Sequence, residues 1–255
     1  LSYIYTHDDE SEITLDHGSN SFGATVDYEG GIGFTVNDTD ATGFVLVGRT
    51  LIGNLVVTAA GPVTQSGAQI IGGLTSITAT GKNVTLDNPS NDFKSAVQII
   101  GANVVVKDGS ATTIGAHTIG IDLGTSTVSG TYTVTSLAGK VIDSGNLVID
   151  GIATVLAASG QDINLDANNN FKSGIRLEGH NVNVEVASTA SLKLGASSGT
   201  STITGWLIGQ SYGNPVTDEG ALNVAGTTKI LATGQNVTLN DTGSNLQGPL
   251  KIKGA

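Results

Sequence analysis

Apolar and polar residues alternate in short runs along the chain, and one such run occurs four times. The four copies read ITLDHGSNSF (13–22), VTLDNPSNDF (84–93), INLDANNNF (163–171) and VTLNDTGSNL (237–246). In each copy the alternation predicts a strand with one buried face, and the following Asn, Ser, Pro or Gly residues predict a corner. The copies start 71, 79 and 74 residues apart, so the chain is predicted to be an array of repeats.

The last residue of each copy is predicted to plug the interior. It is Phe22, Phe93 or Phe171 in the first three copies and Leu246 in the fourth. Further alternating runs follow, and the Gly-x-Asn tripeptides at 101–103 and 179–181 predict bends between two strands. The final run LKIKGA (250–255) matches the start of residues 97–102 and stops at such a bend. We therefore expect an excerpt of a longer array, or a subunit whose end is covered.

The fold predicted from this pattern is all-β. No segment keeps a helical period over three turns, and Val, Ile, Thr and Gly, which dominate the runs, disfavour helix. Each unit cannot bury its inner face alone, whereas stacked units bury a continuous core. We predict a right-handed parallel β-solenoid of about four ~75-residue super-repeats, each with about four coils of roughly 19 residues and thirteen coils in all. The alternative is an array of Ig-like sandwiches, for which ~75 residues is short.

The predicted organisation is one continuous solenoid over residues 13–255, after an acidic segment at 1–12. Its repeats run approximately over 13–83, 84–162 and 163–236, with a partial repeat at 237–255.

Composition and charge exclude several classes of function. There is no Cys, which removes disulfides, thiol catalysis and cysteine metal sites, and no run of 18 apolar residues that would predict a membrane span. The net charge is -11, and residues 1–48 hold nine acids with no Lys or Arg. Because nucleic-acid binding needs a basic surface, we expect no nucleic-acid partner.

Few residues offer catalytic chemistry. Gly195–Gly199 matches G-x-S-x-G, but a nucleophile elbow needs a following helix, and a loop rich in Gly, Ser and Thr is expected here. Paired carboxylates can cleave sugars, yet Asp16, Asp87 and Asp166 recur at a predicted corner, where such side chains bond the backbone. The four histidines are scattered at His7, His17, His117 and His180. We expect no enzyme, no catalytic residue and no cofactor-binding residue.

Calcium at the acidic N-terminal region is the one metal that the sequence suggests. Asp38-Thr39-Asp40 offers two carboxylates. Residues 30–34 approach the calcium-binding nonapeptide, but Phe34 stands where that repeat needs Asp. We therefore assign no metal ligand.

Four stretches resemble the repeat region of large bacterial exoproteins of the filamentous haemagglutinin type. They are SNDF (90–93), STVSG (126–130), VTQSGA (63–68) and ITATGKNVTL (77–86). The resemblance covers nearly the whole chain after residue 12, and it implies a β-solenoid rod that acts as an adhesin or a biofilm matrix component.

Two functional hypotheses follow. The first is a non-enzymatic structural or adhesive rod or filament, extracellular or on the bacterial cell surface, whose partners are further coils of its own kind (by axial stacking or covalent continuation) and surface or matrix glycans. The second is a solenoid that binds or degrades polysaccharide in a groove. An activity screen on acidic and neutral polysaccharides separates the two.

Overall fold

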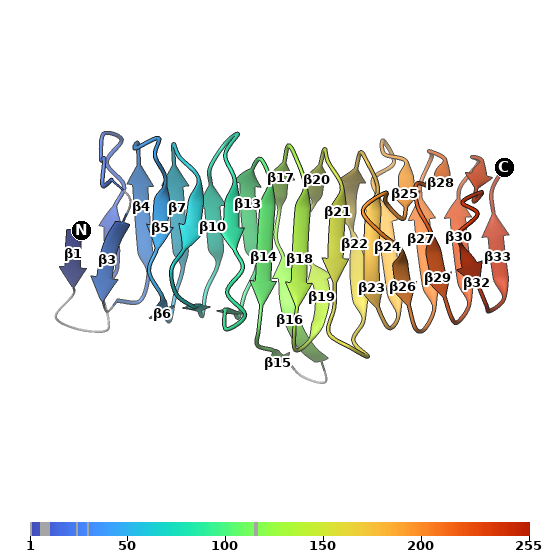
Figure 1. Cartoon of the computed structure of the whole chain (residues 1–255), viewed down its shortest axis with the longest axis horizontal. Helices are drawn as coiled ribbons and strands as arrows, with labels where there is room; N and C mark the ends of the chain where they lie inside the picture. Colours follow the sequence, from blue (N-terminus) through green and yellow to red (C-terminus); the bar gives the residue numbers. More distant parts are fainter. Residues whose placement is uncertain (1, 6–10, 24, 30, 115–116) are drawn as a thin grey trace.

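The structure is a computed structural model that describes residues 2–5, 11–23, 25–29, 31–114 and 117–255. Within these residues the regular structure is all β: short strands stack into a long rod, with the two ends of the chain at opposite ends (Figure 1). None of the described residues forms a helix that is long and apolar enough to cross a membrane.

Two long sheets form the sides of the rod. Sheet 1 has twelve strands in the order β1 (Ser2–Tyr5), β3 (Thr25–Glu29), β5 (Phe44–Leu46), β8 (Val63–Gln65), β11 (Val84–Leu86), β14 (Val104–Asp108), β18 (Tyr132–Ser136), β21 (Ala153–Leu156), β23 (Ile175–Gly179), β26 (Ser201–Ile203), β29 (Leu222–Val224) and β32 (Asn245–Leu246). Sheet 2 follows the order β2 (Ile13–Leu15), β4 (Phe34–Asp38), β7 (Leu55–Ala59), β10 (Thr75–Thr78), β13 (Val97–Gly101), β16 (His117–Leu123), β19 (Lys140–Asp143), β22 (Ile163–Phe171), β24 (Val182–Val186), β27 (Leu207–Ser211), β30 (Thr228–Ala232) and β33 (Leu250–Lys253).

Shorter strands lie between the two sheets. Joined to sheet 2 but off its main path are β15 (Thr112–Ile114), β17 (Ser126–Val128) and β20 (Leu147–Ile149). Two three-stranded sheets are formed by β6 (Arg49–Leu51), β9 (Gln69–Ile71) and β12 (Asp92–Phe93), and by β25 (Leu192–Leu194), β28 (Val216–Asp218) and β31 (Val237–Thr238).

The strands of successive coils pair in parallel, which confirms the predicted parallel β-solenoid. In sheet 2, for example, Phe34 is the partner of Leu55, Leu55 of Thr75, and Thr75 of Val97. One described pair of strands is antiparallel, β15 with β16, which forms a hairpin at the side of the rod (Figure 1). The right-handed sense of the coil stays a prediction.

The predicted coil size was wrong. Each sheet path has twelve strands rather than thirteen, and one coil takes from 20 residues (Leu55 to Thr75) to 28 residues (Val104 to Tyr132). Twelve levels spaced by ~4.8 Å give a rod about 53 Å long between its first and last strands. The alternating runs predicted the strands well, but the corner residues and the β15–β16 hairpin lengthen each coil without adding to the alternation.

One repeat therefore spans three and a half coils instead of four. From Ile13, sheet 2 is entered again at Phe34, Leu55 and Thr75, and the next copy of the motif then begins on sheet 1 at Val84. The third copy, in β22, is back on sheet 2. Successive copies of the motif thus begin on opposite sides of the rod.

The core is a column of aliphatic and aromatic side chains between the two sheets. Phe93 and Phe171 are 3 % and 1 % exposed, so the prediction that the repeated Phe plugs the interior is confirmed for these copies. Phe22 and Leu246 are partly buried and pack against the core. Truncation of a buried Phe costs about 3–5 kcal/mol, so each plug holds its own coil and the coils next to it.

The Gly-x-Asn bends are confirmed, and they also link neighbouring coils. The Asn103 Oδ1 accepts a hydrogen bond from the Thr131 main-chain N–H of the next coil (3.0 Å). In the next repeat, Asn181 Oδ1 accepts from the Trp206 N–H (3.2 Å). Because the corner leaves main-chain donors without a ladder partner, a carboxamide at this position satisfies them.

The acidic segment 1–12 contributes strand β1, which pairs in parallel with β3 from Ser2 opposite Val26 to Tyr5 opposite Glu29. Residues 6–10, which include Asp8, Asp9 and Glu10, lie outside the described residues.

Candidate functional site

A buried carboxamide organises the corner of the repeated motif. Asn91 is fully buried, and its Nδ2 donates to the main-chain oxygens of Leu86 (3.2 Å) and Lys107 (3.1 Å). Its Oδ1 accepts from the Gln69 N–H (2.9 Å), and Gln65 bonds both ends of the carboxamide. Asn91 therefore joins the coil before it, its own coil and the coil after it.

The recurring Asp position does not cap the corner. Asp87 is exposed, and the turn after it is closed by Asn88 Oδ1, which accepts from the Ser90 N–H (2.9 Å). The third copy is one residue shorter and lacks Pro and Gly, and there β22 continues through the corner with a shift in register between Leu165 and Asn169. Asn169, fully buried, takes the place of Asn91.

Three carboxyl groups have raised pKa values, and all three bond the main chain of a neighbouring segment. Burial raises the pKa of Asp108 to about 7, while its two oxygens accept from the N–H groups of Phe93 and Ser110. Burial likewise raises the pKa of Asp143 to about 6, and this carboxylate accepts from Asp166 N–H and from the carboxamide of Asn169. Perturbed carboxyls can mark catalytic sites, but these hold corners.

Asp122 is the third of these groups. Burial raises its pKa, and its Oδ1 accepts from the Ser144 N–H (2.9 Å). It lines a small pocket of about 110 Å³ beside the β15–β16 hairpin.

The G-x-S-x-G match lies in a turn that does not suit a nucleophile. Gly195 and Gly199 have positive φ angles (75° and 146°), and Ala196 pairs with Gly199 in an isolated antiparallel bridge. Strand β26 follows, where a nucleophile elbow requires a helix.

The histidines that can be placed do not cluster. The ring of His17 accepts from the Ser19 N–H at one corner, and the His180 ring bonds Thr204 Oγ1 (3.0 Å) at another. His7 and the side chain of His117 lie outside what the structure describes.

The acidic pair suggested for calcium is engaged with the main chain. Asp38 is 1 % exposed, and its Oδ1 accepts from the Phe22 and Asp40 N–H groups. Phe34 of the glycine-rich stretch is fully buried and stacks on Tyr28 with ring centroids 3.9 Å apart. Among the described residues, no three His, Asp or Glu side chains are grouped as metal ligands.

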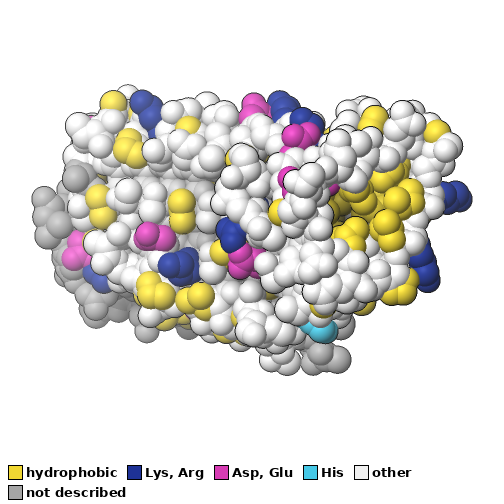
Figure 2. All heavy atoms as spheres, turned by 45° about the vertical axis from the view of Figure 1, so that its right-hand side comes forward, with side chains coloured by type: hydrophobic (Ala, Val, Ile, Leu, Met, Phe, Trp, Pro, Cys, Tyr) yellow, Lys and Arg dark blue, Asp and Glu magenta, His cyan; other side chains and the backbone are white. Residues whose placement is uncertain are grey.

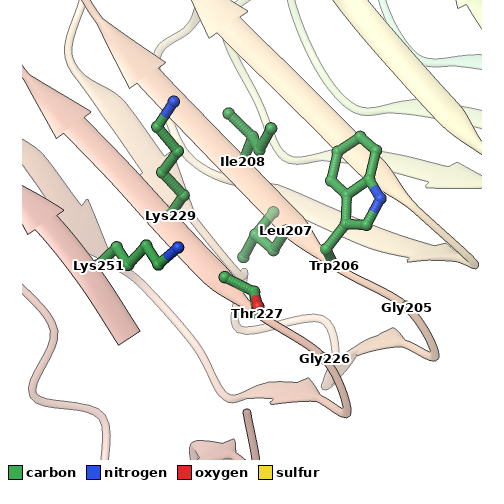
Figure 3. A pocket seen from close by; sticks show the side chains of 8 residues that line it. All are labelled: Gly205, Trp206, Leu207, Ile208, Gly226, Thr227, Lys229 and Lys251. Atoms are coloured by element: carbon green, nitrogen blue, oxygen red, sulfur yellow. The ribbon is translucent and has the colours of Figure 1, made fainter. Parts of the chain in front are cut away.

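The largest hollow on the outer surface lies over sheet 2 near the C-terminal end. Strands β27, β30 and β33 form its floor, and its volume is about 420 Å³. Figure 3 shows the indole of Trp206 and the side chain of Ile208 on one side, with Lys229 and Lys251 on the other. Hydrophobic side chains gather in a hollow toward this end of the molecule, with basic side chains at its rim (Figure 2).

The strand register builds this site. Ile208 is the partner of Lys229, and Lys229 of Lys251, so these three outward side chains form one row across three strands. Trp206, the single Trp of the chain, precedes β27 and is 39 % exposed. A large, half-exposed indole on a β surface is unusual enough to suggest binding. We call the hollow lined by Trp206, Ile208, Lys229 and Lys251 the indole–lysine groove.

Sequence reasoning missed this groove. Trp206, Lys229 and Lys251 lie 23 and 22 residues apart, and only the true coil length of this region brings them side by side. The signal in the sequence was the combination of a lone Trp and three Lys with one acid in residues 220–255.

Comparison with known proteins agrees with the repeats. A model of a family described as "Repeats of unknown function (DUF5649)" matches residues 33–100, 101–178 and 179–253. It therefore places three units where the motif suggested about four repeats, and the second and third units begin at the glycines of the Gly-x-Asn bends. No curated protein and no solved structure matches the chain.

The family match supports the repeat and the solenoid, but it brings no link to the filamentous haemagglutinin type. Three matches that together cover most of the chain show that this protein belongs to the family of repeats of unknown function, DUF5649.

Proposed function

We propose that this chain is a length of non-enzymatic shaft from a bacterial surface or matrix fibre, located outside the cell. The observation that carries the proposal is the use of the perturbed carboxyls: Asp108, Asp122 and Asp143 all accept main-chain hydrogen bonds that hold corners. A solenoid whose polar interior groups serve coil-to-coil contacts is suited to stiffness, because each coil is held by both of its neighbours.

The exposed end of the rod supports a partner of the same kind. Strand β33 pairs with β30 on one side, and its inward residues Leu250 and Ile252 remain 49 % and 50 % exposed. A strand edge with unpaired N–H and C=O groups beside apolar surface is a template for another strand. We propose that a further solenoid coil covers it, from the same polypeptide or from a second copy stacked along the axis.

The test combines imaging, an activity screen and localisation. The purified chain should appear in electron micrographs as rods or as end-to-end fibres, and it should release no sugar from acidic or neutral polysaccharides. Antibodies against the chain should label the outside of intact producing cells or the surrounding matrix. Robust turnover of a polysaccharide would overturn the non-enzymatic proposal, and exclusively cytoplasmic labelling would overturn the location.

A second candidate function, polysaccharide binding on the side of the rod, is favoured by the indole–lysine groove. It is compatible with a shaft, since a rod that also holds glycans is an adhesive one.

A further inference from the structure

The three family units give an internal measure of what the fold requires at each position. The row formed in the third unit by Ile208, Lys229 and Lys251 has counterparts at the same places in the other two. They are Val56, Ser76 and Gln98 in the first unit, and Thr133, Thr154 and Arg176 in the second, paired in the same order across three strands. The solenoid therefore forms with neutral residues in this row, and the fold does not demand two lysines there.

The position of Trp206 also departs from the pattern. Its main-chain N–H bonds the corner carboxamide of Asn181, as the N–H of Thr131 bonds Asn103 in the second unit. A small polar residue thus satisfies the same corner, and the first unit has Asn54 before its equivalent strand β7. The indole is an addition to the surface rather than a support of the corner.

The charges of the third unit differ from those of the second in a second respect. In the second unit, Arg176 forms an ion pair with Glu178, two residues further along β23. The corresponding residues of the third unit are Lys251 and Lys253, which are both basic. Within the described part of the chain, Lys229, Lys251 and Lys253 have no ion-pair partner, and strands β27, β30 and β33 contain no Asp or Glu.

The nearest acid on the strand next to β27 is already engaged. Glu185 of β24 lies beside Gln210 and accepts a hydrogen bond from the Tyr212 hydroxyl (2.9 Å). In a chain of net charge -11, the groove is thus a local cationic surface with an apolar floor and one exposed indole.

We infer that the indole–lysine groove binds a chain of an acidic polysaccharide, with a sugar ring on Trp206 and its carboxylates on Lys229 and Lys251. The inference rests on the proposed function and names the glycan class that the rod would hold. The C–H face of a sugar ring packs on an indole as other apolar groups do, and an ammonium group binds a carboxylate with charge-assisted hydrogen bonds.

Charge spacing favours a polysaccharide over a nucleic acid. The lysines lie on neighbouring strands, so their Cα atoms are about 4.8 Å apart along the rod, a spacing suited to a polymer with one charge per sugar. Duplex DNA carries about one charge per 1.7 Å and depends on many phosphate contacts. Three lysines on an otherwise acidic molecule do not supply these.

The single Trp makes the test direct, because all indole fluorescence of the full chain comes from this groove. The probe is a hexamer of galacturonic acid, titrated at low salt against the parent protein and the double variant Lys229→Gln/Lys251→Gln. The matched control is Lys82→Gln/Lys94→Gln, which removes the same charge from exposed positions on the order of 30 Å away along the rod. Circular dichroism and melting of all three proteins verify that the fold is kept.

We expect a saturable change in Trp206 fluorescence for the parent and the control, with affinities within about twofold of each other. The groove variant should bind about tenfold more weakly or worse, and added salt should weaken the parent because it screens exposed charges. A neutral maltose hexamer should give no comparable change.

Four results would overturn the inference: no binding of the acidic hexamer, an equal loss of affinity in the control variant, equal binding of the neutral hexamer, or tighter binding of a six-nucleotide oligothymidylate. Failure here is distinguishable from failure of the proposed function. An empty groove on a protein that still forms rods leaves the shaft proposal standing, whereas cleavage of the hexamer would sink the non-enzymatic proposal and leave the groove in place.

Discussion

Replacement of Asn91 by Leu should destabilise the middle of the rod more than almost any other polar substitution. The side chain is fully buried and bonds groups in three successive coils. Leucine has a similar shape but no polar atoms, so the Gln69 N–H and the Leu86 and Lys107 carbonyl oxygens lose this partner. A buried polar group left unpaired costs roughly 1–3 kcal/mol. With partial relaxation, we expect a loss of about 3–6 kcal/mol.

The assay needs a local as well as a global readout, because coils of a solenoid can open separately. Urea unfolding followed by circular dichroism gives the global midpoint, and hydrogen exchange read by mass spectrometry gives the protection of peptides that contain Gln69 and Lys107. The matched control is Asn168→Leu, the same change at an exposed position of an equivalent corner, for which we expect less than about 0.5 kcal/mol. An Asn91→Leu protein with unchanged midpoint and unchanged exchange at these peptides would refute the reasoning.

Three further predictions follow from the fold. Phe93→Ala should lower stability by about 3–5 kcal/mol, and its effect on hydrogen exchange should be confined to its own and adjacent coils; unchanged exchange would contradict its role as a plug. Asp108 and Asp143 have raised pKa values in the folded state, about 7 and about 6, so their contribution to stability is present at low pH and is lost as pH rises through these values. The urea midpoint should therefore fall between pH 5 and pH 8, and Asp108→Asn should flatten that fall; an equally steep fall in the variant would show that Asp108 does not titrate there. Asn103→Ala should cost about 1 kcal/mol and speed exchange of the Thr131 amide, and unchanged exchange would rule out this bond between coils.

Patterning of apolar residues was enough to predict the solenoid, the buried Phe93 and the Gly-x-Asn bends, because each depends on residues close in sequence. Coil length was not predictable in the same way. It depends on corners such as the long one between Val104 and Tyr132, whose residues carry no period. The role of Asn91 was missed for a related reason: an Asn in a turn looks solvated until the coils above and below are placed.

The indole–lysine groove depended on the same missing quantity. Lys229 and Lys251 become neighbours only when the register across β27, β30 and β33 is known. The comparison between units was available in principle from the sequence, since Thr154 and Arg176 occupy the matching places in the second unit. It needed the unit boundaries to be aligned to within one residue, because a shift by one reverses which side chains face outward.

The half coil left over in each repeat gives the rod an approximate two-fold screw axis. Units one and three present matching surfaces on the same side, and unit two presents its counterpart, with Thr133, Thr154 and Arg176, on the other. Any surface feature encoded once per unit is therefore displayed alternately to left and right along the axis. A fibre built in this way engages partners on two opposed sides at once, so that weak single contacts combine into strong cross-links between neighbouring fibres or glycan chains.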